Sequence, residues 1–208
     1  MDLNRKYVIT INRELGSGGR TVGRKLAEKL GVAYYDKALI LALQEKYHLS
    51  VEEIERLKGQ EQGWWENFKR KMTFSDEDYN LNQTGIETDS VFHTEIEFLK
   101  SIAKEESCVI AGRSGFYAFR DHPNHLSVFI QASMLSRVDR VAREQHMSKE
   151  EARVTIDKVD QMRENYVNDQ ARTSRYDTRN YQLVLSMDEI SEDAAVEVIL
   201  TYIRNMEV

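Results

Sequence analysis

The sequence predicts an α/β fold in which about five parallel strands are wrapped by helices. Short apolar or β-branched runs alternate along the chain with amphipathic stretches of helical period, the order typical of strand–helix–strand units. The first such unit is complete, because a strand, a glycine-rich turn, a helix and a second strand follow one another before residue 37. The 208 residues fit one domain, residues 1–208.

The N-terminal elements follow from local patterns. Residues 7–11 are short, apolar and β-branched, which predicts a buried strand. Apolar residues recur every four positions over residues 22–30, which predicts a helix that ends at Gly31, a residue typical of helix C-termini. Residues 32–35 are expected to form a second strand with Asp36 at its end.

The rest of the chain continues the alternation after an insertion. Residues 38–106 are predicted to be a helical insertion, in which residues 59–85 are polar and read as irregular or mobile. An amphipathic helix carries Phe92, Ile96, Leu99 and Ala103 and leads to a third strand at residues 108–111. Further strands are expected at 126–130 and 182–185, on either side of a charged helical region at 134–168. The closing helix is predicted to bury Ala195, Val198, Ile199, Tyr202 and Ile203.

Composition excludes several classes of function. The net charge of −6 argues against a general nucleic-acid binder, since affinity for a phosphate backbone needs dense Lys and Arg. No stretch approaches the ~20 apolar residues of a membrane span. One cysteine, Cys108, cannot form an intramolecular disulfide, so we expect a reducing, cytoplasmic location.

The glycine-rich turn predicts a phosphate site. Gly16, Ser17, Gly18 and Gly19 connect a strand to a helix, an arrangement that gathers backbone N–H groups and a helix N-terminus around one point. In the pattern G-x-x-x-x-G-K-[ST] of a P-loop, the glycine, lysine and hydroxyl positions fall on Gly19, Arg20 and Thr21, and the first glycine falls on Glu14. The match is therefore partial, and a tight turn without a ligand is the alternative.

Arg20 is the departure from this pattern with the largest consequence. A guanidinium group is planar and binds in a bidentate manner, whereas lysine acts as a point charge, so Arg20 can neutralise phosphate with a changed geometry. The hydroxyl of Thr21 could be a ligand of Mg²⁺.

Blocks along most of the chain resemble the cytidylate-kinase-like family. They are ITINRE (9–14), GSGGR (16–20), YYDK (34–37), VIAGR (109–113), RDHPN (120–124), VFI (128–130), RVDR (137–140) and DQMRENY (160–166). The resemblance implies a P-loop NTPase-type three-layer fold, a helical nucleoside-monophosphate (NMP)-binding insertion at 38–106 and an arginine-bearing lid at 134–168. It implies a nucleoside monophosphate kinase that uses ATP with Mg²⁺ and an acceptor such as CMP or dCMP.

The resemblance also assigns site residues. Asp36, Arg113, Asp160 and Arg163 would hold the acceptor, and the lid arginines would be Arg137, Arg140 and also Arg143. Other readings stay open. Asp36 could cap a helix that begins at Lys37, and Asp160 and Arg163 could form a surface ion pair. Arg113 directly follows a buried strand, at the sheet edge where ligands sit in α/β folds.

The spacing of the lid arginines supports the same reading. Arg137, Arg140 and Arg143 are three residues apart, so they project from one side of a helix. Phosphoryl transfer needs positive charge directed at the oxygens that gain charge in the transition state, and a helix that closes over the donor supplies it. The alternative is an exposed helix face, on which these arginines pair with neighbouring acids.

Two departures leave the activity open. A cytidylate kinase carries an acidic residue where this chain has Ala111, and lysine where it has Arg20. The hypotheses are therefore a kinase acting on CMP or dCMP, a non-catalytic nucleotide-binding regulator, or a kinase of another small molecule. Trp64 and Trp65 are expected to pack the insertion onto the core or onto a second subunit of a homodimer, and stacking on a base is the alternative.

Overall fold

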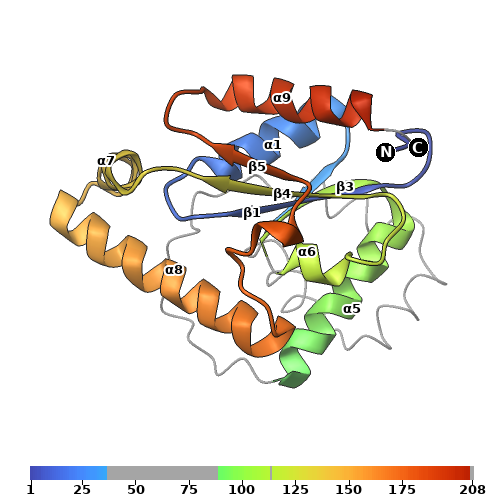
Figure 1. The fold of residues 1–208 in the computed structure, drawn as a ribbon, viewed down its shortest axis with the longest axis horizontal. Coiled ribbons are helices and arrows are strands. Elements are labelled where there is room, and N and C mark those ends of the chain that lie inside the picture. The colour runs from blue at the N-terminus through green and yellow to red at the C-terminus, as the bar shows by residue number, and fades with distance from the viewer. Residues whose placement is uncertain (37–88, 113, 207–208) are drawn as a thin grey trace, which may run out of the picture.

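The computed structural model describes residues 1–36, 89–112 and 114–206. These residues form a five-stranded parallel sheet in the order β2-β3-β1-β4-β5, with helices on both faces, which confirms the predicted fold class (Figure 1). The predicted insertion lies outside the described residues up to residue 88, and so do Trp64 and Trp65. The elements are β1 Val8–Arg13, α1 Gly19–Leu30, β2 Ala33–Tyr35, α5 Asp89–Glu105, β3 Cys108–Ala111, α6 Gly115–Ala118, β4 His125–Gln131, α7 Met134–Gln145, α8 Lys149–Ala171, the 3-10 turn η1 Thr178–Asn180, β5 Leu183–Ser186 and α9 Glu192–Asn205.

Strand β1 is the centre of the sheet. It pairs in parallel with β3 on one side and with β4 on the other. Ile9 and Ile11 face the core under α1 and α9, while Val8 faces the core under α5 and α6. Burial of both faces explains why the strand reads as a continuous apolar run. Because all pairs are parallel, the carboxyl ends of the strands gather at one edge, which points toward α7 in Figure 1.

The amphipathic helix predicted near the end of the insertion is confirmed. Phe92, Ile96, Leu99 and Ala103 of α5 are all buried, and they pack with residues of β3 and α6. Their spacing places them on one side of the helix. These four side chains pack beneath β3, the strand that leads to Gly112.

The face of α9 differs from the prediction at one residue. Ala195, Ile199 and Ile203 are buried as expected, and Tyr202 packs against the same core in a partly buried position. Val198 is 42% exposed, so its predicted burial was wrong. Val196 is fully buried instead, which shifts the centre of the buried stripe away from Val198.

Residues 134–168 are helical as predicted, but they form two helices. His146 ends α7 in a left-handed conformation with a φ of 53°. Ser148 begins α8 with a capping box, in which its hydroxyl accepts from the N–H of Glu151 and the Glu151 carboxylate accepts from the N–H of Ser148. The two helices pack through Val138 and Val141 of α7 and through Ala152 and Ile156 of α8. Every helix in the described ranges is too short or too polar to cross a bilayer.

Candidate active site

The loop from Glu14 to Gly18 leaves the central strand and enters α1. Gly16 and Gly18 have φ values of 80° and 83°, a left-handed conformation that glycine adopts without steric cost. The N–H of Ser17 donates to the carbonyl oxygen of Glu14 at 3.3 Å, and the Ser17 hydroxyl donates to the same oxygen at 2.9 Å. The loop is therefore a tight, internally bonded turn.

The N-terminus of α1 carries no side-chain cap. Gly18 is its N-cap residue and makes no side-chain cap hydrogen bond, and the first turn contains no acidic residue. By contrast, α7, α8 and α9 each begin with a serine whose hydroxyl accepts a backbone N–H, namely Ser133, Ser148 and Ser191. An uncapped helix N-terminus behind two left-handed glycines suits an anion, because N–H groups and the helix dipole both favour negative charge there.

Helix α7 lies directly against this loop. A Cβ atom on Gly16 would lie 2.8 Å from the carbonyl oxygen of Arg137 and 2.9 Å from Cγ2 of Val141. A Cβ atom on Gly18 would lie 3.2 Å from the guanidinium carbon of Arg140. Glu192 at the start of α9 holds that guanidinium through a 2.8 Å bond. The glycines thus permit a close approach that brings Arg140 onto the loop.

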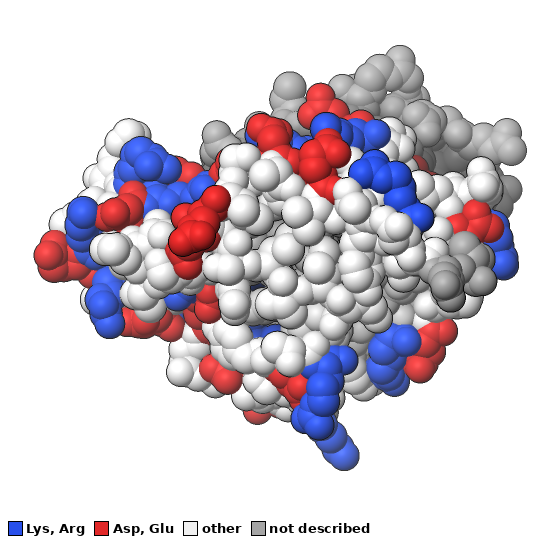
Figure 2. Space-filling model, turned by 45° about the horizontal axis from the view of Figure 1, so that its top comes forward, with Lys and Arg blue, Asp and Glu red and all other residues white. Residues whose placement is uncertain are grey.

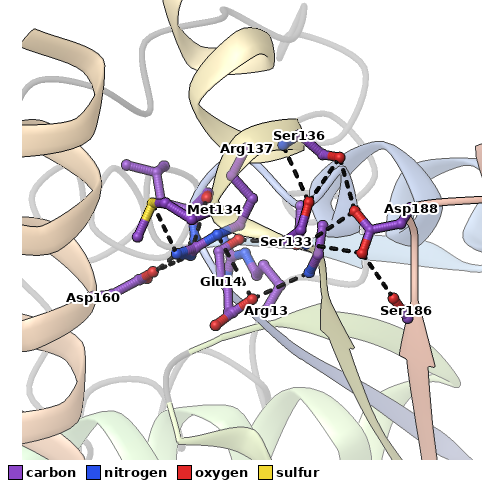
Figure 3. Close-up of polar contacts among 12 residues, drawn as sticks. Arg13, Glu14, Ser133, Met134, Ser136, Arg137, Asp160, Ser186 and Asp188 are labelled. Atoms are coloured by element: carbon purple, nitrogen blue, oxygen red, sulfur yellow. Dashed lines mark hydrogen bonds and ion pairs between the residues drawn. The ribbon is translucent and has the colours of Figure 1, made fainter. Parts of the chain in front are cut away.

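A carboxylate from the end of β5 fixes the start of α7. Asp188 accepts the N–H of Ser133 at 3.0 Å and the hydroxyl of Ser136 at 2.8 Å (Figure 3). The hydrogen bond from the Ser136 hydroxyl is the main cause that lowers the pKa of Asp188, and the Ser133 N–H adds to it. The anchored N-terminus sets the rotation of α7 and so the direction in which Arg137 points.

Arg137 points into the protein rather than into solvent. It is 5% exposed, and its Nη1 lies 2.5 Å from Oδ2 of Asp160, while its Nε lies 3.7 Å from Oε2 of Glu14 (Figure 3). Glu14 also accepts the N–H of Ala132 at 3.1 Å. Burial raises the pKa of the Glu14 carboxyl, against the opposing effects of Arg137 and the Ala132 N–H. The residue that replaces the first P-loop glycine therefore ties the loop to α7.

Asp160 of α8 is the centre of this cluster. Besides Arg137, its carboxylate accepts the N–H of Leu15 at 3.1 Å, and the guanidinium groups of Arg163 and Arg175 lie 3.6 and 3.9 Å away. Asp160 is 7% exposed, so the Asp160–Arg163 contact is part of a buried network and not the isolated surface pair considered above. We call Glu14, Arg137, Asp160, Arg163 and Arg175 the arginine cluster.

A second charged group lies on the other side of the loop. Arg20, in the first turn of α1, lies 3.4 Å from Oδ2 of Asp36 at the end of β2. Asp36 is 5% exposed. The side chain of Arg13 lies against Gly112, whose φ of 78° and missing Cβ make room for it. The two predicted roles, Arg20 toward the donor and Asp36 toward the acceptor, thus fall on adjacent side chains.

The three arginines predicted to belong to a lid lie in three different environments. Arg137 is buried in the arginine cluster, Arg140 covers Gly18, and Arg143 is exposed. The expected ion pairs of an exposed face form only in part, since Arg140 lies 3.7 Å from Glu144. Arg113 lies outside the described residues, so its predicted role stays a prediction.

Two arginines at this edge were missed by the sequence reasoning. Arg13 is the last residue of β1, where a polar residue after a buried run at a sheet edge was an available signal. Arg175 follows α8 in a segment without periodicity, so no local signal marks it. Both belong to the site by contact, because Arg175 Nη2 donates to the Arg13 carbonyl oxygen at 2.5 Å.

Thr21, the predicted magnesium ligand, lies in the first turn of α1. Thr21 is exposed in the first turn of α1, so its hydroxyl could reach an ion bound to phosphates on the loop. In the described ranges, no group of three or more His, Cys, Asp or Glu side chains could hold a metal ion by itself. The hydroxyl of Thr21 therefore fits a Mg²⁺ ion that arrives with a nucleotide.

Comparison with known proteins identifies the family. The sequence profile described as "Cytidylate kinase-like family" matches residues 8–189. The chain belongs to the cytidylate kinase-like family. This family is one of kinase-like, nucleotide-binding phosphotransferases, and the match includes the glycine loop, α7, α8 and β5.

Solved structures agree on the fold. An uncharacterized protein from Eubacterium ventriosum ATCC 27560 is 24% identical with a TM-score of 0.72, over 96% of this chain and 99% of that one. A sugar kinase from Janibacter sp. HTCC2649, in an unliganded structure, is 13% identical with a TM-score of 0.50, over 96% of this chain and 95% of that one. Both likenesses show that this cytidylate kinase-like chain shares its overall fold with these proteins. The comparison with curated proteins gave no match.

Proposed function

We propose that the protein is an ATP-dependent nucleoside monophosphate kinase, which transfers the γ-phosphoryl group of ATP to an acceptor such as CMP or dCMP. The observation that carries the proposal is the uncapped N-terminus of α1 behind Gly16 and Gly18, with the guanidinium of Arg140 against the same loop. Backbone donors, a helix dipole and an arginine converge there on one point, as a triphosphate requires.

The donor half of the reaction follows from this geometry. The triphosphate lies along the loop, where the N–H groups of α1 and Arg20 bind its oxygens. Arg140 neutralises the negative charge that develops between the β- and γ-phosphates. Glu192 keeps Arg140 directed at the loop through its 2.8 Å bond. The Thr21 hydroxyl would hold a Mg²⁺ ion that arrives with the nucleotide, and this ion would supply further neutralisation of phosphate charge.

The acceptor half lies at the same sheet edge. Asp36 and Arg163 come from β2 and α8 on either side of the loop, and Asp160 orients Arg163. In the transfer step, a phosphate oxygen of the acceptor forms a bond to the γ-phosphorus as the bond from that phosphorus to the β–γ bridging oxygen breaks. ADP leaves with the bonding electrons, and no proton has to move. Alignment and charge therefore account for the catalysis expected from this chain.

A second candidate is a nucleotide-binding protein without efficient transfer. It is favoured by two observations: Arg20 is already engaged with Asp36 at 3.4 Å, and β3 ends in Ala111 without an acidic residue that would order the metal. In that case the loop binds nucleotide, but the transferring group is poorly stabilised.

A turnover assay separates the two candidates. Purified protein is incubated with ATP, Mg²⁺ and a panel of nucleoside monophosphates, and the nucleotides are resolved by chromatography. If the protein is a kinase, we expect it to convert at least one monophosphate to the diphosphate, with CMP or dCMP as the best acceptor. Thermal stabilisation by ATP without any turnover at high protein concentration would instead establish the non-catalytic reading.

A matched pair of variants tests the arginine on the loop. Arg140→Met is expected to lower turnover by about a hundredfold, in the range found when one transition-state donor is removed. Arg143→Met is the control, because Arg143 is an exposed arginine on the same helix. Equal turnover in the two variants would remove Arg140 from the mechanism.

A further inference from the structure

Arg175 is a buried arginine with few partners. It follows α8 and is 3% exposed. Its Nη2 donates to the carbonyl oxygen of Arg13 at 2.5 Å, and its Nη1 lies 3.9 Å from Oδ1 of Asp160, beyond hydrogen-bond distance. Within the described residues, Nε and Nη1 have no hydrogen-bond acceptor. Since an underpaired buried guanidinium destabilises a fold, its presence here calls for a role.

The backbone of Arg175 is fixed as firmly as its side chain. The hydroxyl of Tyr181 donates to the Arg175 carbonyl oxygen at 2.7 Å and accepts from Nδ2 of Asn12 at 3.2 Å. The Tyr181 ring packs against Phe129, with ring centroids 5.0 Å apart. Arg175 is thus attached to β1 twice, through Asn12 and through Arg13, at the point where the strand passes into the glycine loop.

These contacts connect Arg175 to the first two residues of the loop. The Arg13 carbonyl that it binds precedes Glu14, the first residue of the loop. The Asp160 carboxylate that it faces accepts the N–H of Leu15, the second residue of the loop. Removing the guanidinium frees the carbonyl and weakens the hold on Asp160 together. The loop then loses two of the contacts that fix its first residues, while the Arg137–Asp160 pair and the bonds within the loop remain.

We propose that Arg175 is a positioning residue for the phosphate loop, which sets the affinity for a polyphosphate chain by fixing Arg13 and Asp160. This inference rests on the proposed function, because it assumes that the loop binds a triphosphate. It adds a residue from the segment between α8 and β5 to a site otherwise built from the ends of β1 and β2 and from α1, α7, α8 and α9. Pre-organised donors bind more tightly than donors that must be ordered on binding.

The test uses the full chain and inorganic tripolyphosphate as the probe, with binding measured by calorimetry. Arg175→Met is expected to lower the affinity about tenfold or more. Arg175→Lys keeps the charge but cannot bind the Arg13 carbonyl and face Asp160 together, so we expect it to lower the affinity too, by about fivefold. Arg179→Met is the control, since Arg179 is 88% exposed in the same segment.

The outcomes separate positioning from a merely structural role. Melting temperature is measured in parallel, and affinities are compared at a temperature where circular dichroism shows each variant folded. Wild-type affinity in a folded Arg175→Met or Arg175→Lys overturns the inference, whatever the change in melting temperature. If Arg175→Met does not fold, Arg175→Lys alone decides.

The same measurements distinguish this inference from the proposed function. If the wild-type protein binds tripolyphosphate, the Arg175 variants bind it more weakly, and no monophosphate is phosphorylated, the proposed kinase function is refuted and the inference stands. If the wild-type protein shows turnover and both Arg175 variants have the wild-type KM for ATP, the proposed kinase function stands and the inference is refuted. Absence of tripolyphosphate binding by the wild-type protein overturns the inference.

Discussion

Replacing Gly16 by alanine should separate α7 from the phosphate loop. The φ of Gly16 is 80°, and an alanine in this left-handed region costs about 1–2 kcal/mol. The new Cβ would also lie 2.8 Å from the Arg137 carbonyl oxygen and 2.9 Å from Cγ2 of Val141. Overpacking of this kind costs a further ~1–3 kcal/mol. The total loss of unfolding free energy is therefore about 2–5 kcal/mol.

Gly31 provides the matched control. Its φ is 66°, but a Cβ there would have no neighbour within 4 Å, so Gly31→Ala bears the conformational cost alone. Urea denaturation followed by circular dichroism should place Gly16→Ala about 1–3 kcal/mol below Gly31→Ala. ATP titration should show weaker binding only in Gly16→Ala, because the displaced α7 carries Arg140 off the loop. Equal stability and equal ATP affinity in the two variants would refute the packing of α7 on the loop.

The other predictions concern a buried histidine and the P-loop arginine. Burial lowers the pKa of His125 from 6.5 to about 4, so the unfolded chain takes up a proton first as the pH falls. The stability that neutral His125 contributes is present above its unfolded pKa of 6.5 and falls by about 2 kcal/mol as the pH drops from 6.5 to 5. His125→Gln should lose this part of the pH dependence in urea denaturation, and an unchanged slope would contradict it. Arg20→Met should weaken ATP binding about tenfold or more in a fluorescence titration, because a charge-assisted phosphate contact is lost. Wild-type affinity in that variant would exclude Arg20 from the donor site.

Charge at the surface differs in character from charge at the site. Lys and Arg are interspersed with Asp and Glu on the side of the molecule that carries α7 and α8 (Figure 2). Pairs such as Lys25–Asp193, between α1 and α9, are exposed and contribute little to stability. The pair between Arg137 and Asp160 is buried, so its geometry matters far more to the loop.

Local patterns were sufficient for most of the fold. The short apolar runs became strands, and the φ of 66° at Gly31 confirms the C-cap expected after residue 30. The prediction of one region at 134–168 did not separate α7 from α8, although Ser148 and Glu151 have the spacing of a capping box. The burial of Val198 was wrong because the side of α9 that faces the core depends on how α9 packs against α1.

The sequence by itself determined the succession of strands and helices along the chain, the glycine turn and the family. These features depend on neighbours within a few residues or on ordered motifs. Only the tertiary structure decided which of three evenly spaced arginines is buried, which covers Gly18 and which faces solvent. It alone brought Arg175 to the start of the loop, more than a hundred residues from Arg13 in the chain. Contacts of that kind are fixed by how the helices pack on the sheet, and no periodicity in the sequence records them.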